Sequence, residues 1–137
     1  MNSRSFIFAL VAAFIWGLAP AFEKIGLAGK IDPYLGVVVR TIPIALAGMF
    51  GLMLMGRTGE LLTIDSRSAF FVIIGGLLAG FFGQIAFYMA LKNAEASTVV
   101  PLAAIYPLIA LFVSVFFLGE AFTITKLIGI TLVIASA

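Results

Sequence analysis

The sequence predicts an all-α integral membrane protein with about five transmembrane helices. Of its 137 residues 64% are hydrophobic and only 10% are charged, whereas an ordinary soluble domain carries about 25% charged residues. The apolar residues form continuous runs, and a spanning helix needs roughly 20 of them in succession. A transmembrane barrel would instead alternate apolar and polar residues over ten-residue segments. Lipid, rather than a polar shell, therefore covers the surface of this chain.

Charges and turn residues divide the chain into five apolar segments within one transmembrane domain over residues 1–137. We expect helices over residues 5–22, 33–56, 68–91, 97–118 and 125–137. The first four are long enough to cross a bilayer, but the fifth gives only about 20 Å of helix for a hydrocarbon core of about 30 Å. The fifth helix is therefore short, or the chain is truncated. No small-x-small cleavage site follows the first segment, so we expect that helix to be retained.

The composition removes several classes of function. The chain has no Cys and no His, which excludes thiol nucleophiles, the usual zinc sites and a Ser-His-Asp triad. We therefore expect no enzyme activity, no catalytic residue, no cofactor and no metal ion. The net charge of +2 arises from scattered Lys and Arg, so no basic surface for nucleic acid is predicted.

Lys and Arg are almost evenly divided between the two membrane faces. The N-terminal face holds four of them, Arg4, Arg57, Arg67 and Lys126. The opposite face holds three, Lys24, Lys30 and Lys92, and Arg40 lies about two turns inside the second helix from that face. An excess of these residues normally sets the orientation. Their balance favours the hypothesis that the chain inserts in both orientations.

Three polar side chains within the predicted helices are candidates for a substrate cavity. Gln84 and Tyr88 are one helical turn apart and share one face; they serve either as contacts between helices or as substrate contacts. Arg40 is a charged residue within a span, which points to function, or its long side chain reaches the headgroups. In the second case Glu23 or Asp32 could pair with it.

Prolines mark two further helices, and one of these helices also carries a stripe of small residues. Pro20 frees the carbonyl of Trp16, so we expect an interruption in the first helix. Pro101 and Pro107 are expected to break the fourth helix, where Ser114 belongs to a stripe of small residues and Tyr106 lies beside it. Broken helices line substrate sites in many transporters, although scaffolds contain them too. The predicted cavity residues are thus Trp16, Arg40, Gln84, Tyr88, Tyr106 and Ser114.

Gly76 and Gly80 form a GxxxG pair, for which close helix packing is the expected role. Glu23 is assigned to the polar linker after the first helix. No Asp or Glu lies in the central part of any predicted span. This absence disfavours proton coupling through a buried carboxylate.

Three stretches together resemble the drug/metabolite transporter superfamily, specifically its EamA-type repeat of five helices. The first is Ala13 to Gly17 with Pro20 and Lys24, and the second is Arg40 in the second helix. The third and most specific stretch runs from Ala86–Leu91 through Ala96–Pro101, Tyr106, Pro107 and Leu118–Glu120 to Gly129. The resemblance covers nearly the whole chain, but the fifth helix stops early. The buried acidic residue of the related small multidrug exporters has no counterpart here.

Full-length members carry two such repeats in opposite orientations, and this chain carries one. The resemblance therefore implies a half-size transporter of a small metabolite or other organic compound. Two subunits, either identical copies or this chain and a paralogous half, would associate antiparallel in the lipid bilayer and work by alternating access. The implied location is the cell membrane of a bacterium or archaeon. The alternative is a scaffold or accessory subunit that transports nothing by itself.

Overall fold

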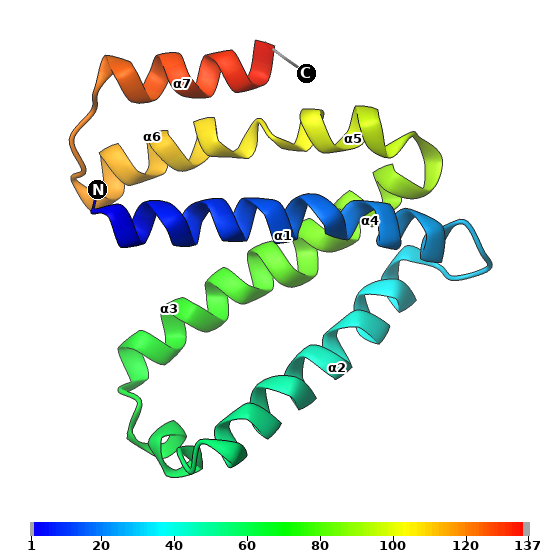
Figure 1. Ribbon diagram of the computed structural model, residues 1–137, viewed down its shortest axis with the longest axis vertical. Coiled ribbons are helices and arrows are strands. Elements are labelled where there is room, and N and C mark those ends of the chain that lie inside the picture. The colour runs from blue at the N-terminus through cyan, green and yellow to red at the C-terminus, as the bar shows by residue number, and fades with distance from the viewer. Residues whose placement is uncertain (1, 136–137) are drawn as a thin grey trace. The chain divides into compact units, whose positions relative to one another are not determined.

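The computed structural model describes residues 2–135, without the side chains of residues 133 and 134 (Figure 1). The helices are α1 (Ser3–Leu27), α2 (Pro33–Leu54), η1 (Thr58–Thr63), α3 (Ser66–Gly76), the π-helix η2 (Leu77–Phe82), α4 (Gly83–Asn93), α5 (Ala96–Ala103), α6 (Tyr106–Leu118) and α7 (Ile124–Ala135). The described part of the chain contains no strand, so the predicted all-α fold is confirmed.

Four stretches of helix within residues 2–135 are long and apolar enough to cross a membrane. They are Ser3–Leu27, Pro33–Leu54, Ser66–Asn93 and Ala96–Leu118. The last helix, α7, has 12 residues, which corresponds to about 18 Å. Residues 136 and 137 of the predicted fifth helix lie outside the described residues.

The chain folds as two compact units, one of residues 22–92 and one of residues 1–21 with 93–137. In the unit of residues 22–92, polar side chains define where helices begin. Asp32 accepts hydrogen bonds from the backbone N–H groups of Tyr34 and Leu35, and Pro33 occupies the first helical position of α2. Asp65 likewise accepts from the Ser68 N–H at 2.9 Å. Both caps satisfy N–H groups that a helix start leaves without partners.

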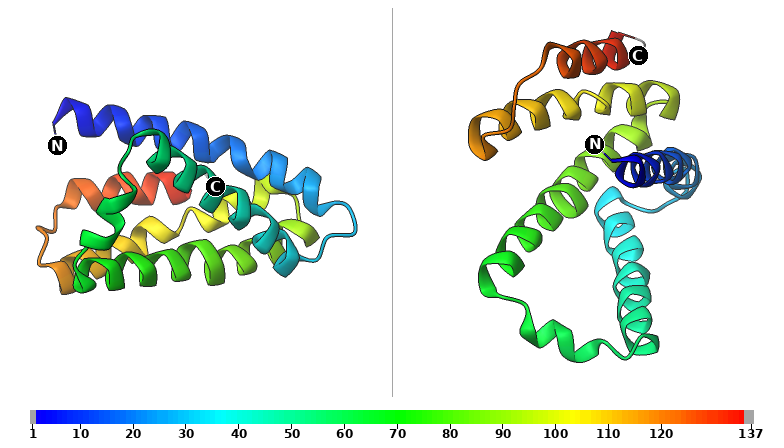
Figure 2. Two further views of the ribbon diagram at one scale, coloured as in Figure 1. Left: turned by 90° about the horizontal axis from the view of Figure 1, so that it is seen from below. Right: turned by 60° about the vertical axis from the view of Figure 1, so that its left-hand side comes forward.

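The buried side chains of this unit gather at one end of it. Leu27, Val37, Tyr88 and Leu91 are each at most 4% exposed. Figure 2 shows α2 and α3 diverging from this end toward η1. The apolar side chains along the diverging helices are exposed in the isolated chain, and in a bilayer lipid or another protein would cover them.

Two lysines strengthen the buried end through backbone carbonyls. Lys24 Nζ donates to the Leu91 carbonyl at 2.6 Å, and Lys92 Nζ donates to the Ile31 carbonyl at 2.8 Å. The carbonyls at a helix end lack partners within the helix. The lysines therefore join the end of α4 to α1 and to the loop before α2.

The first helix is longer than predicted. We expected it to end at residue 22, but α1 continues to Leu27 and contains Glu23 and Lys24. The charges do not end the helix because both side chains find partners in the fold. The expected interruption at Pro20 is also absent, since α1 runs through this residue. Spanning helices tolerate proline where neighbouring groups satisfy the freed carbonyl.

The third span contains a π-helical turn that hydropathy does not predict. Between α3 and α4, the Gly83 N–H donates to the Leu78 carbonyl in the i→i+5 pattern of a π-helix. A Cβ atom added to Gly83 would lie 2.8 Å from the Leu78 oxygen. Only glycine fits at this position without a shift of the backbone.

The unit of residues 1–21 with 93–137 contains a divided span. α5 ends at Ala103 and α6 begins at Tyr106. Pro101 lies within α5, while Pro107 lies in the first turn of α6, where a missing N–H removes no helical hydrogen bond. α6 ends at Gly119, whose φ of +66° is a left-handed conformation that glycine adopts without strain.

Candidate functional site

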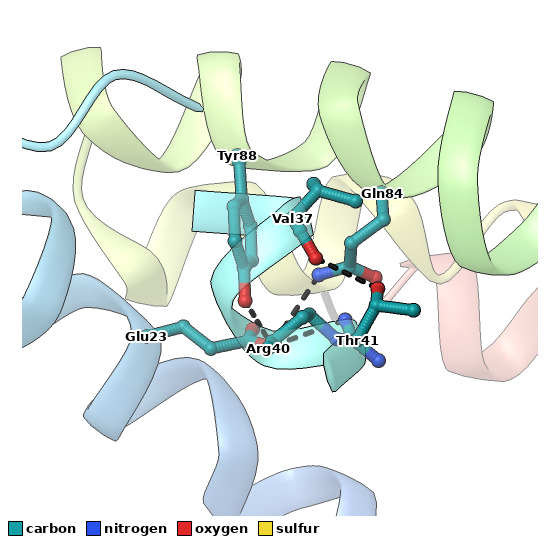
Figure 3. Close-up of polar contacts among 6 residues, drawn as sticks. All are labelled: Glu23, Val37, Arg40, Thr41, Gln84 and Tyr88. Atoms are coloured by element: carbon teal, nitrogen blue, oxygen red, sulfur yellow. Dashed lines mark hydrogen bonds and ion pairs between the residues drawn. The ribbon is translucent and has the colours of Figure 1, made fainter. Parts of the chain in front are cut away.

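A cluster of four polar side chains is centred on the carboxylate of Glu23, which Arg40, Gln84 and Tyr88 contact (Figure 3). Glu23 Oε1 accepts hydrogen bonds from Tyr88 Oη at 2.9 Å and from Gln84 Nε2 at 3.3 Å. Arg40 Nη1 forms an ion pair with the same oxygen at 3.4 Å. The side chains of Glu23 and Arg40 are 17% and 34% exposed. Helices α1, α2 and α4 each supply part of this cluster.

Local spacing and one glycine bring these groups together. Gln84 and Tyr88 are four residues apart on α4, so their side chains lie on one face. The Tyr88 ring lies directly over Gly36 of α2, where an added Cβ would be 3.1 Å from Tyr88 Cδ2. The glycine thus lets α4 approach α2 closely enough for the Tyr88 hydroxyl to reach Glu23.

Thr41 lies beside the cluster but has a different role. Its hydroxyl donates to the Val37 carbonyl of the same helix at 2.7 Å (Figure 3), a common way for threonine to satisfy its hydroxyl within a helix. Thr41 therefore provides a polar neighbour that makes no bond to Glu23.

The cluster is electrically neutral as a whole. Glu23 carries one negative charge, Arg40 carries one positive charge, and the amide and phenol groups are uncharged. A charge within a membrane span is costly unless it is paired or faces a polar cavity. Pairing reduces that cost here.

An open pocket of about 180 Å³ adjoins the cluster. Its polar wall is formed by Glu23, Arg40 and Tyr88, and its apolar wall includes Leu27, Ile31 and Val39. The pocket is smaller than the roughly 300–1,000 Å³ usual for sites of small molecules, and it is open on one side. The described residues contain no group of three or more His, Cys, Asp or Glu that could hold a metal ion.

The predicted cavity residues divide between the two compact units. Arg40, Gln84 and Tyr88 meet in the unit of residues 22–92. Trp16, Tyr106 and Ser114 belong to the other unit. There the Trp16 and Tyr106 side chains are exposed and Ser114 is half-buried.

The predicted packing pair of Gly76 and Gly80 has no close neighbour within the described chain. A Cβ atom added to either glycine would meet no atom within 4 Å. Their predicted role in helix packing stays a prediction.

The sequence did not identify Glu23 as the centre of the cluster. It named Glu23 and Asp32 as two possible partners of Arg40; the structure pairs Arg40 with Glu23 and uses Asp32 to cap α2. The apolar residues after Glu23, Ile25 and Leu27, were the available signal that the first helix continues. Glu23 lies near the end of α1, so its position agrees with the absence of acidic residues from the span centres.

Four long apolar helices, together with a neutral polar cluster supplied by α1, α2 and α4, define a multi-pass membrane protein. The model of the EamA-like transporter family matches residues 3–137, and the chain belongs to this family. The protein is accordingly a membrane transporter.

Two relatives cover nearly the whole chain. An uncharacterised protein of Methanocaldococcus jannaschii is 31% identical over 128 residues, which are 93% of this chain and 89% of the relative. An uncharacterised transporter of a Sinorhizobium species, named for its place in the cobO 3' region, is 28% identical over 129 residues, or 94% and 90% of the two chains. No solved structure matches the chain.

Proposed function

We propose that the protein moves a small organic metabolite across the cell membrane as a half-size subunit of an antiparallel homodimer. The polar cluster of Glu23, Arg40, Gln84 and Tyr88 is the observation that carries this proposal. Polar and charged groups inside a span are costly, and they commonly mark a substrate or ion pathway. An open pocket beside the cluster supports the same interpretation.

The distribution of positive charges supports a dimer of opposed subunits. Counted along the chain, four Lys or Arg residues belong to each face when Arg40 is included. A chain without a charge bias has no strong preference for one orientation. Two opposed copies would form the inverted repeat on which alternating access depends in many transporters.

A transport assay with site variants tests the proposed site. The purified chain is reconstituted in liposomes and supplied with a mixture of labelled metabolites, and internal compounds are identified by mass spectrometry. We expect Gln84→Ala to lower uptake at least about tenfold because it removes a donor to Glu23. The matched control is Thr41→Val, which changes a polar neighbour that does not contact Glu23 and should leave uptake unchanged. Equal uptake by all three proteins would reject the cluster as the transport site.

The same assay separates a transporter from the alternative scaffold. A self-sufficient transporter accumulates substrate when it is the only protein in the liposome. An accessory subunit accumulates none until its partner is added. Wild-type protein that inserts normally but never transports alone would contradict the proposed homodimer.

The orientation of the subunits is tested with a single cysteine, since the native chain has none. Thr58→Cys places a thiol at the start of η1, outside the long helices. Intact cells are labelled with a membrane-impermeant thiol reagent and then permeabilised. Partial labelling that becomes complete after permeabilisation is the expected result for both orientations, whereas all-or-none labelling would contradict it.

A further inference from the structure

The linker between α2 and α3, residues 55–65, begins with a tight glycine turn. The Arg57 N–H donates to the Leu52 carbonyl at 2.9 Å. The Gly56 N–H donates to the Met53 carbonyl at 3.1 Å, and Gly56 has a φ of +66°. These two bonds and the left-handed glycine form a common helix end. The turn ends α2 and leads the chain into η1.

The polar side chains of the linker bond to one another and to its backbone. Arg57 Nε and Nη2 donate to the two carboxylate oxygens of Glu60 at 2.8 and 2.7 Å, a geometry that fixes the orientation of both groups. The Thr63 hydroxyl donates to the Glu60 carbonyl at 2.8 Å, and Asp65 caps α3. The linker is therefore an ordered element whose polar groups find partners locally.

The apolar side chains of the linker are exposed in the isolated chain. They are Leu61, Leu62 and Ile64, of which Leu62 is 92% exposed. Burial of a leucine side chain contributes about 1.5–3 kcal/mol, so an apolar environment would stabilise this arrangement. The exposed apolar residues Met53 and Leu54 end α2 just before the linker. Since α2 is a spanning helix, the linker begins where the hydrocarbon core meets the headgroups.

The charges in and next to the linker cancel. Residues 57–67 contain two cationic and two anionic side chains, Arg57, Arg67, Glu60 and Asp65. The hydrogen bond from Arg57 lowers the pKa of Glu60, and the bond from the Ser68 N–H lowers that of Asp65, so both carboxyl groups are ionised at neutral pH. Anionic lipids attract segments with an excess of Lys or Arg. The neutral linker has no such preference for one leaflet, and its charges favour no charged protein partner.

We propose that the linker between α2 and α3 is an interfacial anchor whose partner is the lipid of either leaflet. Leu62, with Leu61 and Ile64 beside it, enters the boundary between headgroups and acyl chains, where apolar faces are buried by about 5–10 Å. The ion pair of Arg57 and Glu60 stays among the headgroups. An uncharged anchor suits a chain that inserts in both orientations, and its action does not depend on which compound is transported.

Single cysteines test the depth of the linker, because the native chain has none. Leu62→Cys and the control Thr58→Cys lie in the same element and replace exposed side chains, so neither removes internal packing. Each full-length variant carries a bimane label in phosphatidylcholine nanodiscs, where aqueous quenchers reach both faces. Bromine atoms on the acyl chains quench labels in the lipid, and iodide quenches labels in water.

We expect brominated lipid to quench the label at residue 62 at least about threefold more strongly than the label at residue 58, because only the former lies against acyl chains. Iodide should show the reverse order. Replacement of part of the phosphatidylcholine by anionic phosphatidylglycerol should leave both ratios unchanged, since the linker carries no net charge.

Each other outcome overturns the interfacial anchor. Equal quenching of both labels by iodide would place residue 62 in water, and equal quenching by brominated lipid would immerse the whole linker. Protection of residue 62 from both quenchers would mean that protein, such as a second copy of the chain, covers it. Quenching by lipid that requires phosphatidylglycerol would assign the contact to charge instead of apolar insertion.

Discussion

The hydrogen bond from Tyr88 to Glu23 should couple the two residues energetically. The substitution Tyr88→Phe removes the hydroxyl that donates at 2.9 Å and keeps the ring that packs over Gly36. Hydrogen bonds to charged groups contribute about 1.5–3 kcal/mol in proteins generally, whereas neutral ones between membrane helices average about 0.6 kcal/mol. Because the acceptor is a carboxylate shared with two other donors, we expect a coupling energy of about 1.5 kcal/mol.

A double-mutant cycle with Glu23→Leu measures this coupling, because the leucine side chain offers no acceptor. The free energy of unfolding of each variant is determined in mixed micelles of detergent and dodecyl sulfate. Tyr34→Phe is the control, because the Tyr34 ring contacts Phe81 and the Tyr34 hydroxyl bonds to no described residue. This substitution should change the free energy of unfolding by less than about 0.5 kcal/mol. Additivity of Tyr88→Phe and Glu23→Leu within about 0.5 kcal/mol would refute the described contact.

Two further predictions concern the third span. Gly83→Ala should destabilise the protein by about 1–3 kcal/mol, because the added Cβ would lie 2.8 Å from the Leu78 oxygen. Gly80→Ala is the control in the same unfolding assay. Its added Cβ meets no atom within 4 Å, so this substitution should be neutral or slightly stabilising. The second concerns Asp65, whose pKa is lowered by the hydrogen bond from the Ser68 backbone N–H. The folded state favours the carboxylate form of Asp65. The stabilisation that this cap gives the folded state is therefore fully present at pH values above the unfolded pKa of about 3.9, and it is lost as the pH falls through the lower pKa of the folded state. The protection factor for amide exchange in the first turn of α3, taken against the intrinsic exchange rate at each pH, should therefore fall below about pH 4, and Asp65→Asn should remove this pH dependence.

The sequence was sufficient to predict the spans and part of the site. Continuous apolar runs determine the approximate positions of the four long helices because lipid requires them. The pairing of Gln84 with Tyr88 on one face also followed from helical spacing alone. Both predictions depend on local periodicity.

The remaining features depend on contacts between distant residues. The end of α1 was placed too early because a charge usually marks a helix boundary, and the partners that retain Glu23 in the helix lie up to 65 residues away. The π-turn at Gly83 is a local change in hydrogen bonding, and the hydropathy of the segment is the same with or without it. The apolar pattern has no signal for the π-turn, and its only signal for the continuation of α1 is the pair Ile25 and Leu27.

The separation of the cluster in sequence also has a consequence for the synthesis of the chain. Arg40 follows Glu23 by 17 residues, but Gln84 and Tyr88 follow it by 61 and 65. At about 5–20 residues per second, the ribosome adds the 44 residues from Arg40 to Gln84 in about 2–9 s. Throughout this interval Arg40 is the one cluster partner of the Glu23 carboxylate that is already present in the emerging helices. Loss of Arg40 should therefore reduce the yield of inserted protein, whereas loss of the Tyr88 hydroxyl acts only after the third span has arrived.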